Sequence, residues 1–243
     1  MDARIKSGHD KQKTLRDSRG WIGPLAMAIE VKVCGLTDAD AVATAATGGA
    51  RYLGFVFYPP SPRSLTPARA GELARGAPPA CARVGVFVDP DDALLDEVLD
   101  EVPLDYLQLH GAETPERVAA IRARTGRGVI KALKIADPGD LTPVPAYAEV
   151  ADLLMFDARP PDEPGRLPGG NGLAFDWRLL HGLEVARPWL LSGGLSADNI
   201  EDAVRLCRAR AVDVSSGVEL APGRKDPQKI RRFLELAGTL EPA

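Results

Sequence analysis

The sequence predicts an α/β protein, and three observations favour a single closed barrel of eight parallel strands with helices between them, a (β/α)8 barrel. From residue 30 onward, short runs of β-branched and apolar residues alternate with amphipathic stretches of helical period. Eight such runs recur at a nearly regular spacing, and this alternation implies a parallel sheet. Chemically capable residues follow many of the runs, whereas a doubly wound open sheet, the alternative, gathers them at one topological switch point.

The expected strands are apolar runs bounded by turn residues. In chain order they are Glu30–Cys34, Tyr52–Phe57, Arg83–Val88, Asp105–Leu109, Val129–Lys134, Leu153–Asp157, Trp189–Ser192 and Ala211–Ser215. Amphipathic segments between them, several preceded by Thr, Asp or Ser at the N-cap, are expected to be helices. They include Asp38–Thr47, Pro67–Arg75, Asp91–Leu99, Pro115–Arg124 and Ala197–Arg208.

The fifth connection, Ala136–Val150, contains three prolines and is expected to be a loop or a degenerate helix. Residues 1–28 are polar and lack an apolar period, so we expect a leader that is disordered or foreign to the fold. The sequence therefore predicts one catalytic domain over residues 29–243, a TIM barrel with a degenerate fifth helix.

Composition restricts the class of protein and its partners. The 243 residues are 45% hydrophobic, 26% charged and 5% aromatic, which is typical of a soluble globular protein and excludes a collagen, a coiled coil or a wholly disordered chain. No apolar run approaches the roughly 18 to 20 residues that span a bilayer, and the charged N-terminus lacks the apolar segment of a signal peptide. We expect a cytoplasmic protein without a membrane partner.

Charge and cysteine content exclude two further classes. Residues 1–28 carry six Lys/Arg and three Asp, so the remaining chain has 24 basic and 31 acidic residues, a net charge of −7. An acidic barrel argues against nucleic acid as the partner. The three cysteines, Cys34, Cys81 and Cys207, are widely spaced without a CxxC pair, so we expect reduced thiols rather than a metal site or a disulfide scaffold.

Four strand ends finish in chemically capable residues: Cys34, His110, Asp157 and the segment from Asp213 to Ser216. In a barrel all of them converge on the rim at the C-terminal ends of the strands, where the active site forms. Cys34 has a packing alternative, because a lone strand cysteine is usually a small buried hydrophobe. Its place at the rim beside Gly35 favours a functional thiol, and alternation places Lys32 one layer deeper, where a cation favours the thiolate.

Asp157 closes an apolar strand, so it is either a helix cap or a catalytic acid. The following segment, Arg159–Pro164, is extended and turn-like, which weakens the capping interpretation. A partly desolvated carboxyl keeps some of its proton near neutrality, the state that a general acid needs.

Two glycine-bearing turns near the C-terminus have the features of an anion site. Gly193 and Gly194 lead into the helix expected from Ala197, whose dipole and free N–H groups attract anions, and Ser216–Gly217 follows the eighth strand. Because the loops after strands seven and eight often bind phosphate in such barrels, we predict a phosphate site there.

Three other features each have two interpretations. Arg63, in a proline-rich loop after the second strand, either clamps a carboxylate or is solvated. Lys131 and Lys134 on the fifth strand suit Schiff-base chemistry, or they pair or face a helix. The segment Gly169–Gly172 is a flexible lid or a linker.

The chain closely resembles the phosphoribosylanthranilate isomerase family of tryptophan biosynthesis. The resemblance rests on VKVCGLTDADAV, LGFVFYPPSPRSLTP, VGVFVDP, LDYLQLHGAE, VIKALKI, LLMFDAR, GGNGLAFDW, LLSGGLSADNI and VDVSSGVELAPGRKD, in this order from about Glu30 to the C-terminus. The sequence departs from the family at Ala158, where Thr is common, and at Asn171, where Thr or Ser is usual. Both departures leave the catalytic positions intact.

The resemblance implies an Amadori rearrangement of N-(5-phosphoribosyl)anthranilate to 1-(2-carboxyphenylamino)-1-deoxyribulose 5-phosphate, without a metal or an organic cofactor. By similarity Asp157 is the general acid and Cys34 the general base. The other implied roles are Arg63 for the anthranilate carboxylate, Asp213 for amino or hydroxyl groups, the amides of Gly193, Gly194, Ser216 and Gly217 for the phosphate, and His110 in the wall of the site. The partner is then a small phosphorylated sugar–anthranilate, and the protein is a monomer or a homodimer.

Three other functions compete with this one. A Schiff-base aldolase would depend on Lys131 or Lys134. A broader sugar isomerase, shared by histidine and tryptophan biosynthesis, would use carboxylates at the ends of strands one and six, and Cys34 occupies the first of these positions. A non-catalytic phosphate-binding barrel is disfavoured by the pair Cys34 and Asp157.

Overall fold

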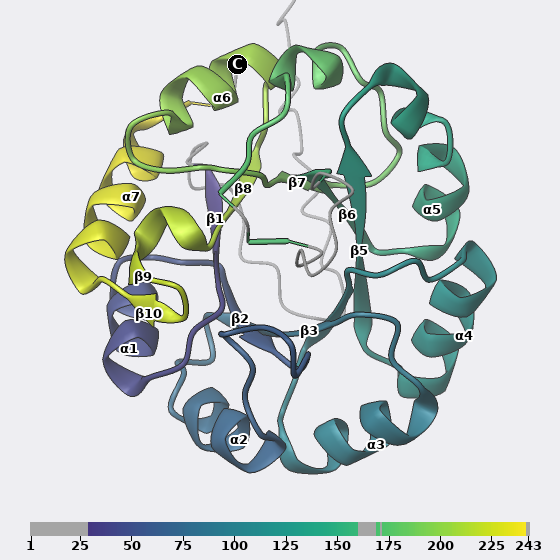
Figure 1. The fold of residues 1–243 in the computed structure, drawn as a ribbon, viewed down its shortest axis with the longest axis vertical. Helices are drawn as coiled ribbons and strands as arrows, with labels where there is room; N and C mark the ends of the chain where they lie inside the picture. Colours follow the sequence, from purple (N-terminus) through teal and green to yellow (C-terminus); the bar gives the residue numbers. More distant parts are fainter. Residues whose placement is uncertain (1–28, 160–168, 171, 242–243) are drawn as a thin grey trace, which may run out of the picture.

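The computed structural model describes residues 29–159, 169–170 and 172–241. Eight parallel strands form a closed barrel in chain order, and pairing between the first and the last strand closes the ring. They are β1 (Glu30–Cys34), β2 (Tyr52–Val56), β3 (Ala82–Phe87), β4 (Tyr106–Leu109), β5 (Gly128–Ile135), β6 (Leu153–Ala158), β7 (Trp189–Leu191) and β8 (Ala211–Val214). Figure 1 shows this ring surrounded by helices, which confirms the predicted (β/α)8 barrel.

The outer layer consists of seven α-helices in the described part of the chain. They are α1 (Ala39–Thr47), α2 (Pro67–Arg75), α3 (Asp92–Glu101), α4 (Pro115–Thr125), α5 (Val144–Val150), α6 (Ile200–Cys207) and α7 (Pro227–Thr239). The side chains of Asp38, Thr66, Asp91 and Thr114 accept a backbone N–H of the first turn of α1, α2, α3 and α4. Each N-cap satisfies a donor that the helix itself leaves unpaired.

The connections after β5 and β6 depart from the regular unit. After β5 come a single 3-10 turn, η1 (Pro138–Leu141), and the seven-residue α5, so the predicted degenerate fifth helix is confirmed. In the described part of the sixth connection the helix is reduced to the 3-10 turn η2 (Trp177–Leu180), capped by Asp176.

An unpredicted hairpin follows β8. The 3-10 turn η3 (Ser216–Val218) leads into β9 (Glu219–Ala221) and β10 (Arg224–Lys225), which pair antiparallel before α7 begins. Strands of three and two residues are too short to produce a periodic pattern, so they leave no signal in the sequence.

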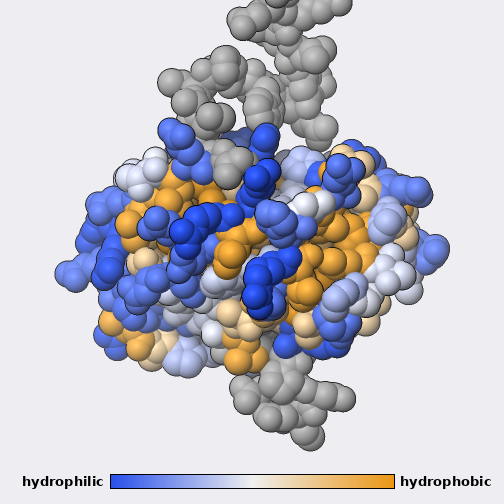
Figure 2. Space-filling model, turned by 90° about the horizontal axis from the view of Figure 1, so that it is seen from above, coloured by the Kyte–Doolittle hydropathy of each residue, from blue (hydrophilic) through white to orange (hydrophobic). Residues whose placement is uncertain are grey.

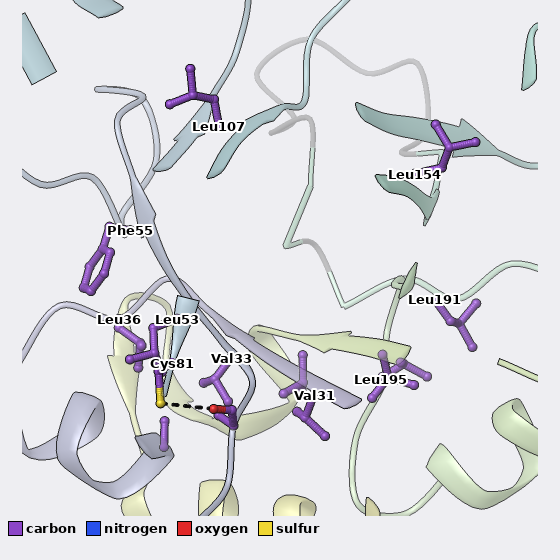
Figure 3. Packing of buried hydrophobic residues seen from close by; sticks show 14 of the residues in the cluster. Val31, Val33, Leu36, Leu53, Phe55, Cys81, Leu107, Leu154, Leu191 and Leu195 are labelled. Atoms are coloured by element: carbon purple, nitrogen blue, oxygen red, sulfur yellow. Dashed lines mark hydrogen bonds between the residues drawn. The ribbon is translucent and has the colours of Figure 1, made fainter. Parts of the chain in front are cut away.

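Alternation along the strands separates two cores. Val31 and Val33 point outward into the large apolar cluster between strands and helices, part of which is drawn in Figure 3. Inside the ring a smaller apolar cluster includes Val84, Ile130 and Leu190. This inner layer is the packed floor beneath the mouth of the barrel.

The outer surface carries a mixture of residues. In the view of Figure 2, hydrophilic residues surround several apolar patches. Among the described large apolar side chains, Leu206 and Leu220 are the exposed ones. No helix within the described ranges is long and apolar enough to cross a membrane.

Candidate active site

A cavity opens at the C-terminal ends of the barrel strands, where the sequence predicted the active site. Eight of the nine predicted site residues line it: Cys34, Arg63, His110, Asp157, Gly193, Gly194, Asp213 and Ser216. The ninth, Gly217, follows Ser216 and is packed against the carbonyl of Leu195. The barrel thus brings residues from both ends of the chain into one wall.

Cys34 shares the mouth of the barrel with a buried ion pair. The ammonium of Lys32 is fully buried and donates to Oδ1 of Asp213 at 2.7 Å. The other carboxylate oxygen of Asp213 accepts a hydrogen bond from Oγ of Ser192 at 3.1 Å. Lys32 and Cys34 are two positions apart on β1, so both side chains face the interior, as alternation predicts.

The resting form of Cys34 is the thiol. Burial raises its pKa, and the Lys32 ammonium, which lowers it, offsets this only in part, while Asp213 adds to the upward shift. The expected influence of Lys32 therefore has the right sign, but the expectation that it favours the thiolate overall is wrong, because desolvation is the larger effect. Burial also lowers the pKa of Lys32, but Asp213 and Cys34 outweigh it and the net pKa is raised, so Lys32 stays an ammonium.

Asp157, the last residue but one of β6, lines the cavity and is 4% exposed. Its Oδ1 accepts the N–H of Ala158 at 2.9 Å, and its Oδ2 lies 3.1 Å from Nε2 of His110. The other ring nitrogen, Nδ1, lies 2.8 Å from Nε2 of Gln108. A chain of hydrogen bonds therefore runs from β4 to the Asp157 carboxyl and fixes its orientation.

Arg63 is buried, so the solvated alternative is wrong. Its Nε and Nη2 donate to the two carboxylate oxygens of Glu219, both at 2.8 Å. Glu219 Oε1 also accepts from Nζ of Lys225 at 2.8 Å. Arg63 does form a bidentate clamp, but toward a carboxylate of the protein, and it also lines the cavity.

The glycine segment after β6 lies on the site, which the linker interpretation does not explain. The carbonyl of Gly170 accepts from Nη2 of Arg63 at 3.3 Å. A Cβ at Gly169 would lie only 2.8 Å from Nε2 of His110 and 2.9 Å from Oδ2 of Asp157. A side chain at residue 169 would therefore collide with two site residues. Asn171 lies outside the described residues.

The turn after β7 exposes two glycines to the cavity. Gly193 and Gly194 both have positive φ, 91° and 64°, a conformation that favours glycine. The helix that follows begins at Ile200, three residues later than expected, and Asn199 Oδ1 accepts the N–H of Ser196 at 2.8 Å. An anion at Gly193 and Gly194 would therefore meet the amides of this turn. The start of α6 does not lie directly behind the two glycines, contrary to the prediction.

The lysines of β5 do not reach the cavity. Lys131 Nζ donates to Oε2 of Glu113 at 2.6 Å and to the carbonyl of Gly111 at 2.8 Å, both outside the ring. Lys131 and Glu113 are buried, and neither they nor Lys134 line the cavity. The Schiff-base interpretation therefore has no β5 lysine at the site.

Four site residues were not singled out from the sequence: Gln108, Ser192, Glu219 and Lys225. Gln108 and Ser192 stand on or beside strands whose inward positions alternation identifies, and that pattern would have found them. Glu219 and Lys225 lie in the hairpin after β8, for which the sequence carried no periodic signal.

Comparison with known proteins gives consistent matches. The family model described as N-(5'phosphoribosyl)anthranilate (PRA) isomerase matches residues 31–236. An N-(5'-phosphoribosyl)anthranilate isomerase of Paracoccus denitrificans is 59% identical over 87% of this chain and 98% of its own. The crystal structure of phosphoribosyl anthranilate isomerase from Thermotoga maritima is 36% identical with a TM-score of 0.78, over 87% of this chain and 100% of that one. A crystal structure described as phosphoribosyl anthranilate isomerase in complex with reduced 1-(o-carboxyphenylamino)-1-deoxyribulose 5-phosphate is 33% identical with a TM-score of 0.73, over 87% of this chain and 100% of that one.

Proposed function

Since this chain belongs to the N-(5'-phosphoribosyl)anthranilate isomerase family, we propose that Asp157 and Cys34 are the acid and the base of its reaction. The protein converts N-(5-phosphoribosyl)anthranilate into 1-(2-carboxyphenylamino)-1-deoxyribulose 5-phosphate in tryptophan biosynthesis. One observation carries the assignment: the carboxyl of Asp157, near the end of β6, and the thiol of Cys34, at the end of β1, line the same cavity.

The reaction needs one proton donor and one proton acceptor. Asp157 donates a proton to the furanose oxygen, the bond from this oxygen to C1 breaks, and the nitrogen lone pair forms an iminium ion. Cys34 then removes the proton from C2, and the electrons of that bond neutralise the iminium by forming a C1–C2 double bond. Return of a proton to C1 and loss of the enol proton give the ketose, so substrate and product are isomers.

The surroundings of Cys34 fit a base that is needed only after ring opening. Its thiolate is disfavoured by burial and favoured by the Lys32 ammonium. The iminium ion adds a second positive charge beside the substrate's C2, which favours the thiolate further and acidifies the C2 proton. Because the resting thiol must first release its own proton to water before it can accept the C2 proton, we assign Lys32 the role of stabilising the thiolate that then acts as the base.

The rest of the wall fits the remaining parts of the substrate. Arg63 presents its guanidinium for the anthranilate carboxylate, and Asp213 lies beside Cys34 for amino or hydroxyl groups. In this proposal the backbone amides of Gly193–Gly194 and of Ser216–Gly217 donate hydrogen bonds to the phosphate. We assign His110 the role of orienting Asp157, through the contact between Nε2 and Oδ2.

We further place the protein in the cytoplasm as a monomer or homodimer. The three free cysteines support this location, because thiols persist in a reducing compartment. Sedimentation of the purified chain distinguishes the two oligomeric states.

The test is an assay of the purified protein with N-(5-phosphoribosyl)anthranilate, following the disappearance of substrate and the appearance of the ketose by chromatography. We expect Cys34→Ser to lose most of the turnover, because a hydroxyl is a far weaker base at neutral pH. Cys81→Ser is the matched control, since that thiol donates to the carbonyl of Ala50 in the outer core, as drawn in Figure 3. Nearly full turnover in Cys34→Ser would mean that the thiol is packing and that the proposed base is wrong.

A further inference from the structure

Three charged side chains form a buried cluster beside the cavity. Arg63, Glu219 and Lys225 are 5%, 7% and 4% exposed, and Glu219 lies between the two cations. Arg63 lines the cavity, whereas Glu219 and Lys225 do not. Glu219 therefore acts on a ligand through Arg63, and Lys225 acts through Glu219 and through Ser215, which also lines the cavity.

The hairpin that carries Glu219 and Lys225 forms hydrogen bonds with the segments on either side of it. The carbonyl of Gly223, at its turn, accepts from Oγ1 of Thr37 at 3.0 Å, behind β1. The backbone carbonyl of Glu219 accepts from Nζ of Lys229 on α7 at 2.8 Å. A rigid hairpin is thus available to hold a long side chain from the loop after β2.

The hydrogen bonds of Lys225 identify it as an ammonium. Its Nζ lies 2.9 Å from the carbonyl of Ser215, 3.3 Å from the Oγ of Ser215 and 2.8 Å from Oε1 of Glu219. An ammonium has three donors and no acceptor, and all three partners can accept. With Lys225 charged, the cluster carries two positive charges and one negative charge.

We propose that Glu219 and Lys225 are positioning residues that make Arg63 selective for a substrate carrying a carboxylate. This inference rests on the proposed function, in which Arg63 meets the anthranilate carboxylate. Glu219 alone would neutralise Arg63 and remove its attraction for an anion. Lys225 restores a net positive charge, while Glu219 holds the guanidinium fork in one orientation.

The orientation of the Arg63 guanidinium follows from which of its nitrogens already have hydrogen-bond partners. Nε and Nη2 are bound by Glu219, and Nη2 is also bound by the carbonyl of Gly170. Among the contacts between described residues, Nη1 has no hydrogen-bond partner and is the nitrogen left for a ligand. A planar donor fixed in this way loses little conformational freedom when a carboxylate binds.

The experiment compares two ligands on the full-length protein by titration calorimetry. One is reduced 1-(o-carboxyphenylamino)-1-deoxyribulose 5-phosphate, and the other is its phenylamino analogue, in which hydrogen replaces the carboxylate. The ratio of their dissociation constants is the carboxylate preference. We expect Lys225→Met to lower this preference by about tenfold or more, as is usual for a buried charge next to a charged contact, and to bind the phenylamino ligand within about twofold of wild type.

Glu219→Gln separates orientation from charge. It adds net positive charge to the cluster, so a purely electrostatic role predicts a higher carboxylate preference. We expect a lower preference, because an amide cannot accept from both Nε and Nη2. A rise in the preference would overturn the positioning role of Glu219.

Matched variants keep the outcomes distinct. Lys229→Met removes a neighbouring lysine whose ammonium, within the described residues, binds the backbone carbonyl of Glu219, and we expect it to keep the wild-type preference. Lys225→Arg keeps the positive charge and should retain most of the carboxylate preference. This variant therefore distinguishes a lost charge from a damaged fold. An unchanged affinity for the phenylamino ligand shows that a variant is folded. If Lys225→Met loses this affinity, the comparison of Lys225→Arg with wild type is used in its place.

Arg63→Met tells the two proposals apart. If it abolishes the preference while Lys225→Met and Glu219→Gln keep it, the role of the hairpin is overturned and the role of Arg63 stands. If Arg63→Met itself keeps the preference, the proposed carboxylate site is wrong. In the double variant Arg63→Met with Glu219→Gln we expect no loss beyond that of Arg63→Met alone, since Glu219 acts through Arg63.

Discussion

The thiol of Cys34 lies in the barrel mouth with an ammonium and a carboxylate, and the balance of these charges sets its protonation. Burial and Asp213 raise its pKa, and Lys32 lowers it. The sign of each effect can be tested one residue at a time, because alkylation by iodoacetamide reports the thiolate.

We predict that Lys32→Met shifts the pH profile of Cys34 alkylation further upward. In the wild type the midpoint lies above the ordinary thiol value of 9.0, and removing the cation leaves Asp213 unopposed. Asp213→Asn is the control of opposite sign and should move the midpoint down. Peptide mapping after labelling gives the rate at Cys34 alone. Identical midpoints in all three proteins would show that Lys32 does not influence the thiol.

We predict that Asp157→Asn folds and binds the reduced product analogue but loses activity by about 10²- to 10⁴-fold, the usual contribution of a general acid. An asparagine retains an acceptor for the N–H of Ala158 and a partner for His110, so the geometry of the wall is kept. It has no acidic proton for the ring oxygen. Steady-state kinetics measure the effect, and activity within tenfold of wild type would remove Asp157 from the mechanism.

Among the elements of the fold, the loops after the strands supply part of the wall of the site. Residues 169 and 170 lie against Arg63 in the connection after β2, His110 directly after β4 and Asp157 near the end of β6. The absence of a side chain at residue 169 is what permits this approach.

We predict that Gly169→Ala lowers kcat/KM by about tenfold or more, because its Cβ would displace the Asp157–His110 pair, and misplacement near 1 Å can cost about 10²-fold. Gly238→Ala is the matched control. It lies in α7, where a Cβ would meet nothing within 4 Å, and alanine there should stabilise the helix by about 0.5 to 1 kcal/mol without changing activity. Equal kinetics for both variants would place the glycine segment away from the reacting groups in solution.

For the whole molecule, stability depends on closing the ring between β1 and β8. Glu30 and Val31 pair with Ala211 and Val212, so the beginning of the barrel is held by its end. Ile29 and Val31 are buried in the outer core. The boundary between dispensable and required residues should therefore lie close to residue 29.

We predict that deleting residues 1–28 leaves activity unchanged and Tm within about 3 °C of the full chain, the shift that roughly 1 kcal/mol produces in a domain of this size. Deleting residues 1–31 is the control. It removes two buried apolar side chains and two register pairs of β1, each side chain worth about 2 kcal/mol, and should lower Tm by several degrees or more. A large fall in Tm for the shorter deletion would mean that residues 1–28 belong to the folded domain.

Local patterns in the sequence were enough to predict the class of fold, the strands and the convergence of Cys34, His110, Asp157 and Asp213 on one rim. These conclusions follow from local patterns: a strand alternates with period two, a helix with a period near 3.6, and parallel strands joined by helices all end at the same side of the barrel. Every one of these residues stands at or next to a strand end, so its place follows from the strand alone.

The pairing of buried charges could not be predicted from local patterns, because it arises when distant segments fold together. Lys32 and Asp213 are 181 residues apart in the chain, and Arg63 and Glu219 are 156 apart. The first pair exists because the ring closes, and the second because the hairpin after β8, which gave no periodic signal, packs against the loop after β2. The net pKa of Cys34 was decided in the same way, because it depends on burial as well as on the nearest cation, and burial is a property of the assembled barrel rather than of any segment.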